Sequence, residues 1–151
     1  MIKKLLLSIA TLGPIGYVRG SGTLATLSTL SVSYFLPALS CSLLVQIILL
    51  SFSLLVCVAL CSYTAVHFQS TDPSQVVIDE ALGSLVTFVG IPIELPYLAV
   101  GFILFRFFDI SKCCGINRIE TLNNGWGVML DDVAAGILSN ILLRCIFSFW
   151  S

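Results

Sequence analysis

Five carboxylates in the second half of the chain have the types and spacing of an acidic catalytic cluster: Asp79, Glu80, Asp109, Asp131 and Asp132. Two unit charges about 4 Å apart repel by about 4 kcal/mol at an effective dielectric constant of about 20, so such a cluster needs protons, nearby cations or a bound metal ion. Oxygen ligands with little His or Cys favour a hard cation, Mg²⁺ first. Because Mg²⁺ held by few carboxylates also binds phosphate, the cluster indicates metal-dependent phosphoryl chemistry.

Basic residues accompany the acidic ones and offer a second way to neutralise them. Arg106, Asp109 and Lys112 follow one another at i, i+3 and i+6 and therefore share a helix face. Arg19 precedes the glycine-rich stretch 20–23, whose backbone N–H groups could bind a phosphate. The same stretch could instead start a helix with Thr23 as its cap. The residues alone leave both interpretations of Arg19 and Thr23 open.

The composition points to a membrane protein. The chain has 151 residues, enough for a single domain over residues 1–151, of which 58% are hydrophobic and 10% are charged. Soluble domains are about 45–50% apolar and about 25% charged. The net charge of −1 gives no basic field for nucleic acid. One histidine and no paired Cys-x-x-Cys motifs argue against a zinc site.

Glycine, proline and charged residues divide the chain into five apolar segments, at about 23–39, 41–66, 75–90, 95–111 and 127–150. The second is uncharged and longer than the roughly 20 residues needed to span a bilayer. The third would be only ~24 Å long as a helix, less than the ~30 Å of hydrocarbon, so we expect it to be tucked between the others.

Charge is distributed unevenly between the two ends of these segments. If consecutive segments alternate in direction, every residue of the acidic cluster falls on one side, together with Lys3, Lys4 and Arg19. The positive-inside rule makes that side cytoplasmic. We expect the N-terminal segment to be retained near the lipid surface, since Gly13-Pro14 follows its short apolar core without a clear cleavage site. The sequence thus predicts an all-α, integral-membrane helical bundle of about five apolar helices, with the acidic site at the cytoplasmic helix ends.

Helical phase predicts that the acidic residues face one another. Asp79 precedes Gly83 by four residues, and Asp132, Gly136 and Asn140 also lie four apart. Stripes of small residues let membrane helices approach closely. The acidic residues at the head of each stripe should therefore face the interior of the bundle, although adjacent acids diverge by about 100° and one of each pair could be supporting only.

Three blocks of sequence together resemble phosphatidylglycerophosphatase A. They are Asp79-Glu80 followed by Gly83, then Phe105-Arg106-x-x-Asp109-x-x-Lys112, then Gly125-x-Gly127-x-Met129-x-Asp131-Asp132-x-x-Ala135-Gly136. The chain departs from the family at Ser21-Gly22-Thr23, where Pro-Gly-Thr is usual, and at Cys113-Cys114-Gly115, where a proline often follows the motif lysine. These departures affect the expected substrate preference more than the reaction type.

The resemblance implies an all-helical, Mg²⁺-dependent enzyme that converts phosphatidylglycerophosphate to phosphatidylglycerol in a bacterial inner membrane. It implies that the five carboxylates belong to the site, with Arg106 and Lys112 as phosphate partners and Asp72 as a weaker candidate. We expect Asp79, Asp109, Asp131 and Asp132 to supply the metal ligands, with Glu80 supporting them or acting as a base. The partner is a phospholipid substrate, and no protein partner is implied.

Two alternative functions follow from the same residues. A small ion or proton transporter would use intramembrane carboxylates as a relay, which predicts acids spread across the membrane depth. A phosphatase for another lipid phosphomonoester would keep the same site with a different headgroup.

Overall fold

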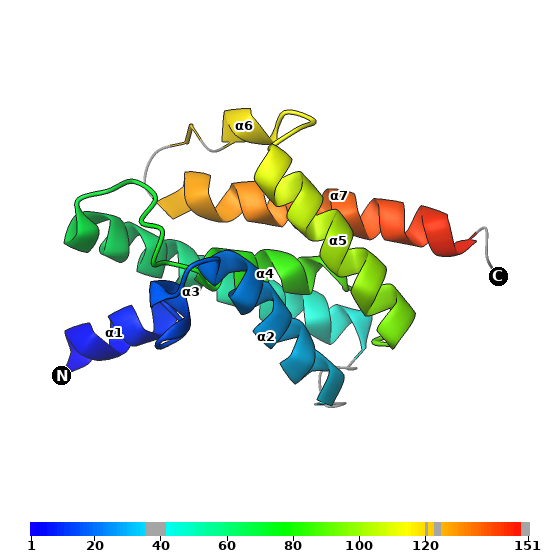
Figure 1. Ribbon diagram of the computed structural model, residues 1–151, viewed down its shortest axis with the longest axis horizontal. Coiled ribbons are helices and arrows are strands. Elements are labelled where there is room, and N and C mark those ends of the chain that lie inside the picture. The colour runs from blue at the N-terminus through cyan, green and yellow to red at the C-terminus, as the bar shows by residue number, and fades with distance from the viewer. Residues whose placement is uncertain (36–41, 120, 123–124, 149–151) are drawn as a thin grey trace.

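The computed structural model describes residues 1–35, 42–119, 121–122 and 125–148, and every regular element in this part of the chain is helical (Figure 1). The elements are α1 (Ile2–Ala10), the 3₁₀ turn η1 (Ile15–Tyr17), α2 (Ser21–Phe35), α3 (Leu43–Phe68), α4 (Ile78–Thr87), α5 (Leu95–Ser111), α6 (Ile116–Ile119) and α7 (Gly125–Ser148). The all-α prediction is confirmed.

The five predicted segments correspond to α2, α3, α4, α5 and α7, with α1 and α6 as additional short helices. The fourth segment has the predicted limits. The third is shorter than 75–90 because α4 begins only at Ile78 and ends before Gly90, whose φ is +64°. The segments at 23–39 and 127–150 begin two residues earlier than predicted, at Ser21 and Gly125. Residues 36–39, 41 and 149–150 of the predicted segments lie outside the described residues.

Helix α4 lies at the centre of the bundle. It packs against α2, α3, α5 and α7, so its sides are covered by other helices (Figure 1). Its 10 residues extend over ~15 Å, about half the ~30 Å hydrocarbon thickness, so α4 does not cross a bilayer. This agrees with the expectation of a short helix tucked between the longer ones.

Helix α3 is the one described helix that is long and apolar enough to span a membrane by itself. Its 26 residues extend over ~39 Å. Large apolar side chains are exposed along it, including Leu44, Ile48 and Phe52 at 68%, 57% and 67%. An apolar surface of this extent is unusual on a soluble monomer and typical of a lipid-facing helix. That α3 and the other long helices cross a bilayer as a five-helix membrane bundle stays a prediction.

Two glycines let α4 and α7 cross at close range. A Cβ atom at Gly83 would come within 2.7 Å of the backbone oxygen of Asp132, and one at Gly136 would overlap the backbone oxygen of Gly83. At the far end of α4, the Asn140 side chain donates hydrogen bonds to the carbonyls of Thr87 and Val89, at 2.8 and 3.0 Å. The small-residue stripes predicted from helical phase therefore lie at the contact between the two helices.

Candidate active site

All five predicted carboxylates border one cavity of about 200 Å³, where the first turn of α4 meets α7 and the end of α5. Its lining comprises Ser21, Asp72, Ser74, Val76, Asp79, Glu80, Asp109, Lys112, Val128, Asp131 and Asp132. The carboxylates come from α4, α5 and α7. The acids are therefore gathered in one cavity, whereas a proton relay would distribute them along a path through the membrane.

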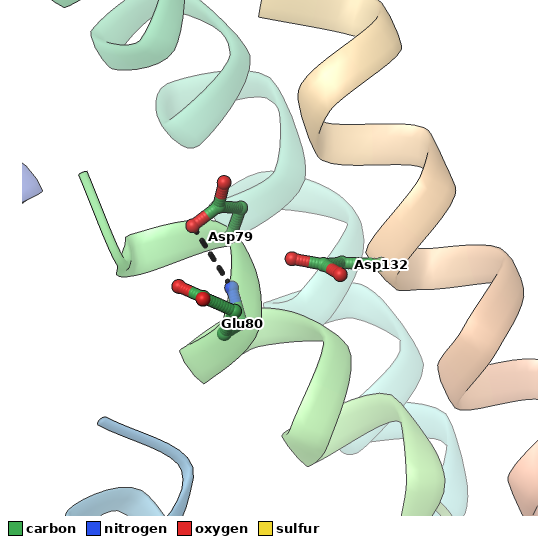
Figure 2. Close-up of side chains that lie close together, drawn as sticks. All are labelled: Asp79, Glu80 and Asp132. Carbon is green, nitrogen blue, oxygen red and sulfur yellow. Dashed lines mark hydrogen bonds between the residues drawn. The ribbon is translucent and has the colours of Figure 1, made fainter. Parts of the chain in front are cut away.

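Within this cavity, Asp79, Glu80 and Asp132 form an acidic triad. One carboxylate oxygen from each lies within 4.8 Å of the other two. Figure 2 shows Asp132 extending from α7 toward Asp79 and Glu80 on α4. Asp79 and Asp132 are almost fully buried, with 5% and 3% exposed, and Glu80 is partly buried. Three carboxylate oxygens at this separation could ligate one hard cation.

The other two carboxylates are paired with basic side chains. Arg106 on α5 donates to Asp109 one turn further on, with the two atoms 2.5 Å apart. Lys112 follows the last residue of α5 in a left-handed conformation, with φ +48°, and its ammonium group donates to Asp131 on α7. These two pairs place a guanidinium and an ammonium group next to the triad.

Burial changes the protonation of the carboxylates on α4. The pKa of Glu80 is raised to about 7, mainly by burial and also by the nearby charge of Asp109, against the lowering effects of the hydrogen bond with Asp79 and of the Arg106 charge. Burial, followed by the neighbouring Glu80, also raises the pKa of Asp79 well above its usual value. Glu80 Oε2 is buried without a hydrogen-bond partner. A group of buried carboxylates in this condition is stabilised by a proton or a cation.

The glycine-rich stretch at the start of α2 packs directly on this site. A Cβ atom at Gly22 would overlap the Glu80 carboxylate and lie 3.2 Å from a guanidinium nitrogen of Arg106. Thr23 is partly buried and Arg19 is exposed, and neither is among the residues that line the cavity. The stretch is thus a helix start beside the site, and direct contacts of Arg19 and Thr23 with a phosphate stay predictions.

Sequence reasoning did not single out Ser21 and Ser74 as site residues, and both border the cavity. The Ser21 hydroxyl donates to the Ser74 carbonyl at 3.2 Å. Ser21 lies in the glycine-rich stretch already noted, but no pattern links it to a serine 53 residues later. Asp72, the weaker candidate, also lines the cavity.

Comparison with models of known protein families identifies a family to which most of the chain is similar. The family model described as "Phosphatidylglycerophosphatase A" matches residues 8–147. Phosphatidylglycerophosphatase A of Escherichia coli is 29% identical over 131 residues, 85% of this chain and 75% of that protein. Phosphatidylglycerophosphatase A of Haemophilus influenzae is 37% identical over 93 residues, 60% of this chain and 56% of that protein.

A third relative carries a different name. A "Putative phosphatidylinositol-3-phosphatase" of Bacteroides thetaiotaomicron is 43% identical over 75 residues, which are 48% of this chain and 47% of that protein. The match with this relative therefore spans about half the length of each chain. No solved structure matches the protein.

Proposed function

The chain belongs to the phosphatidylglycerophosphatase A family, and from this membership and the acidic cavity we propose that it removes the terminal phosphate of phosphatidylglycerophosphate and so produces phosphatidylglycerol. The observation that carries the proposal is the convergence of five carboxylates and Lys112 from three helices on one cavity. The family model covers residues 8–147, which include every one of these side chains.

The two ion pairs supply the cations for phosphate binding. Lys112 borders the cavity, and Arg106 lies against Asp109 at its edge. Each of these cationic side chains is held by a carboxylate, so it is already oriented when a phosphate binds. Hydrogen bonds from charged donors to phosphate are about twice as strong as neutral ones. We assign Lys112 and Arg106 to the binding of the terminal phosphate and to stabilising the charge that develops on it.

The triad fits a magnesium ion. Its donors are all carboxylate oxygens, and the ion pairs of the described residues are formed by Asp109 and Asp131 rather than by the triad. We propose Asp79 and Asp132 as ligands, with Asp109 and Asp131 completing the acidic surroundings. When bound, Mg²⁺ would polarise the phosphate and lower the pKa of a water molecule.

Glu80 is our candidate for the general base. It borders the cavity, and its Oε2 atom is buried without a hydrogen-bond partner, so this oxygen is open to accept a proton. Glu80 would accept a proton from the attacking water at this oxygen as the bond from phosphorus to the glycerol oxygen breaks, and it would return this proton to the leaving alkoxide, while Lys112 and Arg106 hold the phosphate. An aspartyl-phosphate intermediate is the alternative route, and it would be detected as phosphate covalently bound to an aspartate in acid-quenched single-turnover reactions.

We also propose that the protein is a multi-pass component of a bacterial inner membrane with the cavity facing the cytoplasm. The length and exposed apolar surface of α3 support the membrane placement. The basic residues on the side of the cavity, including Lys3, Lys4 and Arg118, support the orientation.

The test is phosphate release from phosphatidylglycerophosphate by the purified protein, with Mg²⁺ and with a chelator. We expect rapid release with Mg²⁺ and little with the chelator. Equal rates in both would eliminate the metal from the proposal, and no release in either would eliminate the activity. In cells that lack the protein, phosphatidylglycerophosphate should accumulate.

A phosphatidylinositol 3-phosphate phosphatase is the second candidate, because the Bacteroides relative that bears this name is 43% identical over its aligned part. A panel containing phosphatidylglycerophosphate, phosphatidylinositol 3-phosphate and phosphatidic acid separates the two functions. We expect the highest kcat/KM for phosphatidylglycerophosphate.

A further inference from the structure

Helix α1 has three different faces. Ile2, Leu5 and Ile9, spaced i, i+3 and i+7, share one face and are exposed at 72%, 60% and 42%. Ala10 is fully buried, and Leu6 is partly buried against α3. The exposed apolar face therefore lies beside the face that packs on the protein.

The third face of α1 is polar. Lys4 and Ser8, four residues apart, are both exposed and lie more than 90° around the helix from the centre of the apolar face. Lys3 is exposed as well. The chain contains no acidic residue before Asp72, so α1 carries a positive charge that its neighbours in sequence do not offset. Lysine on one side and large apolar residues on the other are typical of a helix that lies in a membrane surface.

The position of α1 along α3 gives a second, independent observation. The exposed large apolar side chains of α3 lie between Leu43 and Val56, apart from Val66 in its last turn. Leu6 borders an apolar groove of about 460 Å³ with residues that include Leu55, Val56 and Tyr63. Helix α1 therefore joins α3 where the apolar band ends, which is the level of the lipid–water boundary if α3 spans the bilayer.

Helix α1 is also connected to the acidic triad. The Ala10 carbonyl accepts a hydrogen bond from the Val77 backbone N–H, with the two atoms 3.0 Å apart. Val77 immediately precedes α4, whose first turn carries Asp79 and Glu80. The depth of α1 in the membrane surface therefore fixes the depth of the triad.

We propose that α1 is an interfacial helix that binds an anionic lipid surface, with Ile2, Leu5 and Ile9 among the acyl chains and Lys3 and Lys4 against lipid phosphates. The proposal rests on the membrane placement in the proposed function. It adds a surface through which the content of anionic lipid in the membrane affects the activity of the site.

Collision accessibility of nitroxide labels tests the placement of α1. Single labels are introduced at positions 4, 5, 8 and 9 of α1 and at position 52 of α3. The background is a variant of the whole chain in which the native cysteines are replaced and which still releases phosphate. The protein is reconstituted in phosphatidylcholine–phosphatidylserine vesicles. We expect labels at 5, 9 and 52 to collide preferentially with oxygen, which partitions into lipid, and labels at 4 and 8 with an aqueous nickel chelate.

Each other pattern has a definite meaning. Aqueous labels at 5 and 9 with a lipid-exposed label at 52 would overturn the interfacial helix and leave the membrane placement of α3 intact. Lipid exposure at all four α1 positions would overturn a surface location. An aqueous label at 52 would refute the membrane placement itself.

A second measurement keeps the native cysteines. We expect phosphate release by the parent protein to rise with the phosphatidylserine content of phosphatidylcholine vesicles, and this dependence to be reduced in the Lys3→Gln/Lys4→Gln variant. The same dependence in both proteins would refute the role of the lysines in binding anionic lipid.

Discussion

Gly83 on α4 lies directly against the backbone of Asp132 on α7, so close that a Cβ atom at Gly83 would be 2.7 Å from the Asp132 carbonyl oxygen. The contact brings the helix that carries Asp79 and Glu80 next to the helix that carries Asp132. The geometry of the acidic triad therefore depends on Gly83, a residue without a side chain.

Replacing Gly83 with alanine should separate α4 from α7 and reduce activity. Overpacking of this kind costs about 1–3 kcal/mol, and a displacement of about 1 Å in a site can lower the rate about 100-fold. Phosphate release and thermal unfolding in detergent measure both effects. Ser31→Ala introduces alanine on an exposed part of α2 and should behave like the parent protein. Equal activity of the Gly83→Ala variant would show that the close crossing is not required.

Replacing Glu80 with glutamine removes the proposed base with little change in size. We expect kcat to fall by about 10²–10⁴, because the proton acceptor is lost. KM should change little, because the cationic side chains of Lys112 and Arg106, which bind the phosphate, remain. Glu94→Gln is the matched control, since Glu94 is exposed just before α5, at its end remote from Lys112. A Glu80→Gln variant as active as Glu94→Gln would exclude Glu80 as the base.

Asp132→Asn should act mainly by weakening the binding of Mg²⁺. The loss of one carboxylate from the triad should raise the Mg²⁺ concentration for half-maximal activity by on the order of tenfold or more, since even supporting partners of metal ligands change affinity by about 10–100-fold. A Mg²⁺ titration of phosphate release measures this shift. An unchanged Mg²⁺ requirement would remove Asp132 from the ligand set.

Much of the fold could be predicted from the sequence because apolar runs and their interruptions are strong signals in a membrane-type chain. The 95–111 helix was predicted at its limits, and the stripes headed by Asp79 and Asp132 identified the contact between α4 and α7. Helical period and side-chain size alone determine these features.

The internal arrangement of the site could not be predicted in the same way. Asp109 and Asp131 form ion pairs with Arg106 and Lys112, whereas Glu80 joins Asp79 and Asp132 in the triad. The role of Asp109 and Asp131 as metal ligands stays a prediction. Which carboxylate forms an ion pair with Lys112 depends on where α5 ends and on the left-handed conformation of Lys112. Such details follow from tertiary packing, which the local pattern of residues does not encode.

Lys112→Met should remove a phosphate partner and leave the buried Asp131 without this ammonium group. We expect phosphate release to fall by about 10²–10³, the range for loss of one group that stabilises transition-state charge. Lys112→Arg should recover part of the rate because it keeps the positive charge. Arg118→Met removes an exposed base from α6 and is the control. Similar rates for Lys112→Met and Arg118→Met would contradict the assignment.

Asn140 closes the end of α4 opposite to the triad, and its replacement should loosen the whole helix. Its side-chain amide donates to the carbonyls of Thr87, the last residue of α4, and of Val89, two residues further on. Its oxygen accepts a 2.8 Å hydrogen bond from Arg144 Nε. Carbonyls at a helix end have no partner within the helix. The amide satisfies the Thr87 carbonyl, whereas the Val89 carbonyl also accepts a 2.6 Å hydrogen bond from Arg144 Nη2.

Asn140→Ala should therefore lower the free energy of unfolding by about 1–3 kcal/mol, the expected loss for two hydrogen bonds at about 0.5–1.5 kcal/mol each. Unfolding in detergent measures this change, and Asn117→Ala on the exposed surface of α6 is the matched control. Because α4 also carries Asp79 and Glu80, the apparent Mg²⁺ affinity should fall together with stability. If both alanine variants unfold at the same midpoint, Asn140 does not hold α4 in place, and the packing of α4 against the neighbouring helices, including the Gly83–Asp132 contact, is sufficient to do so.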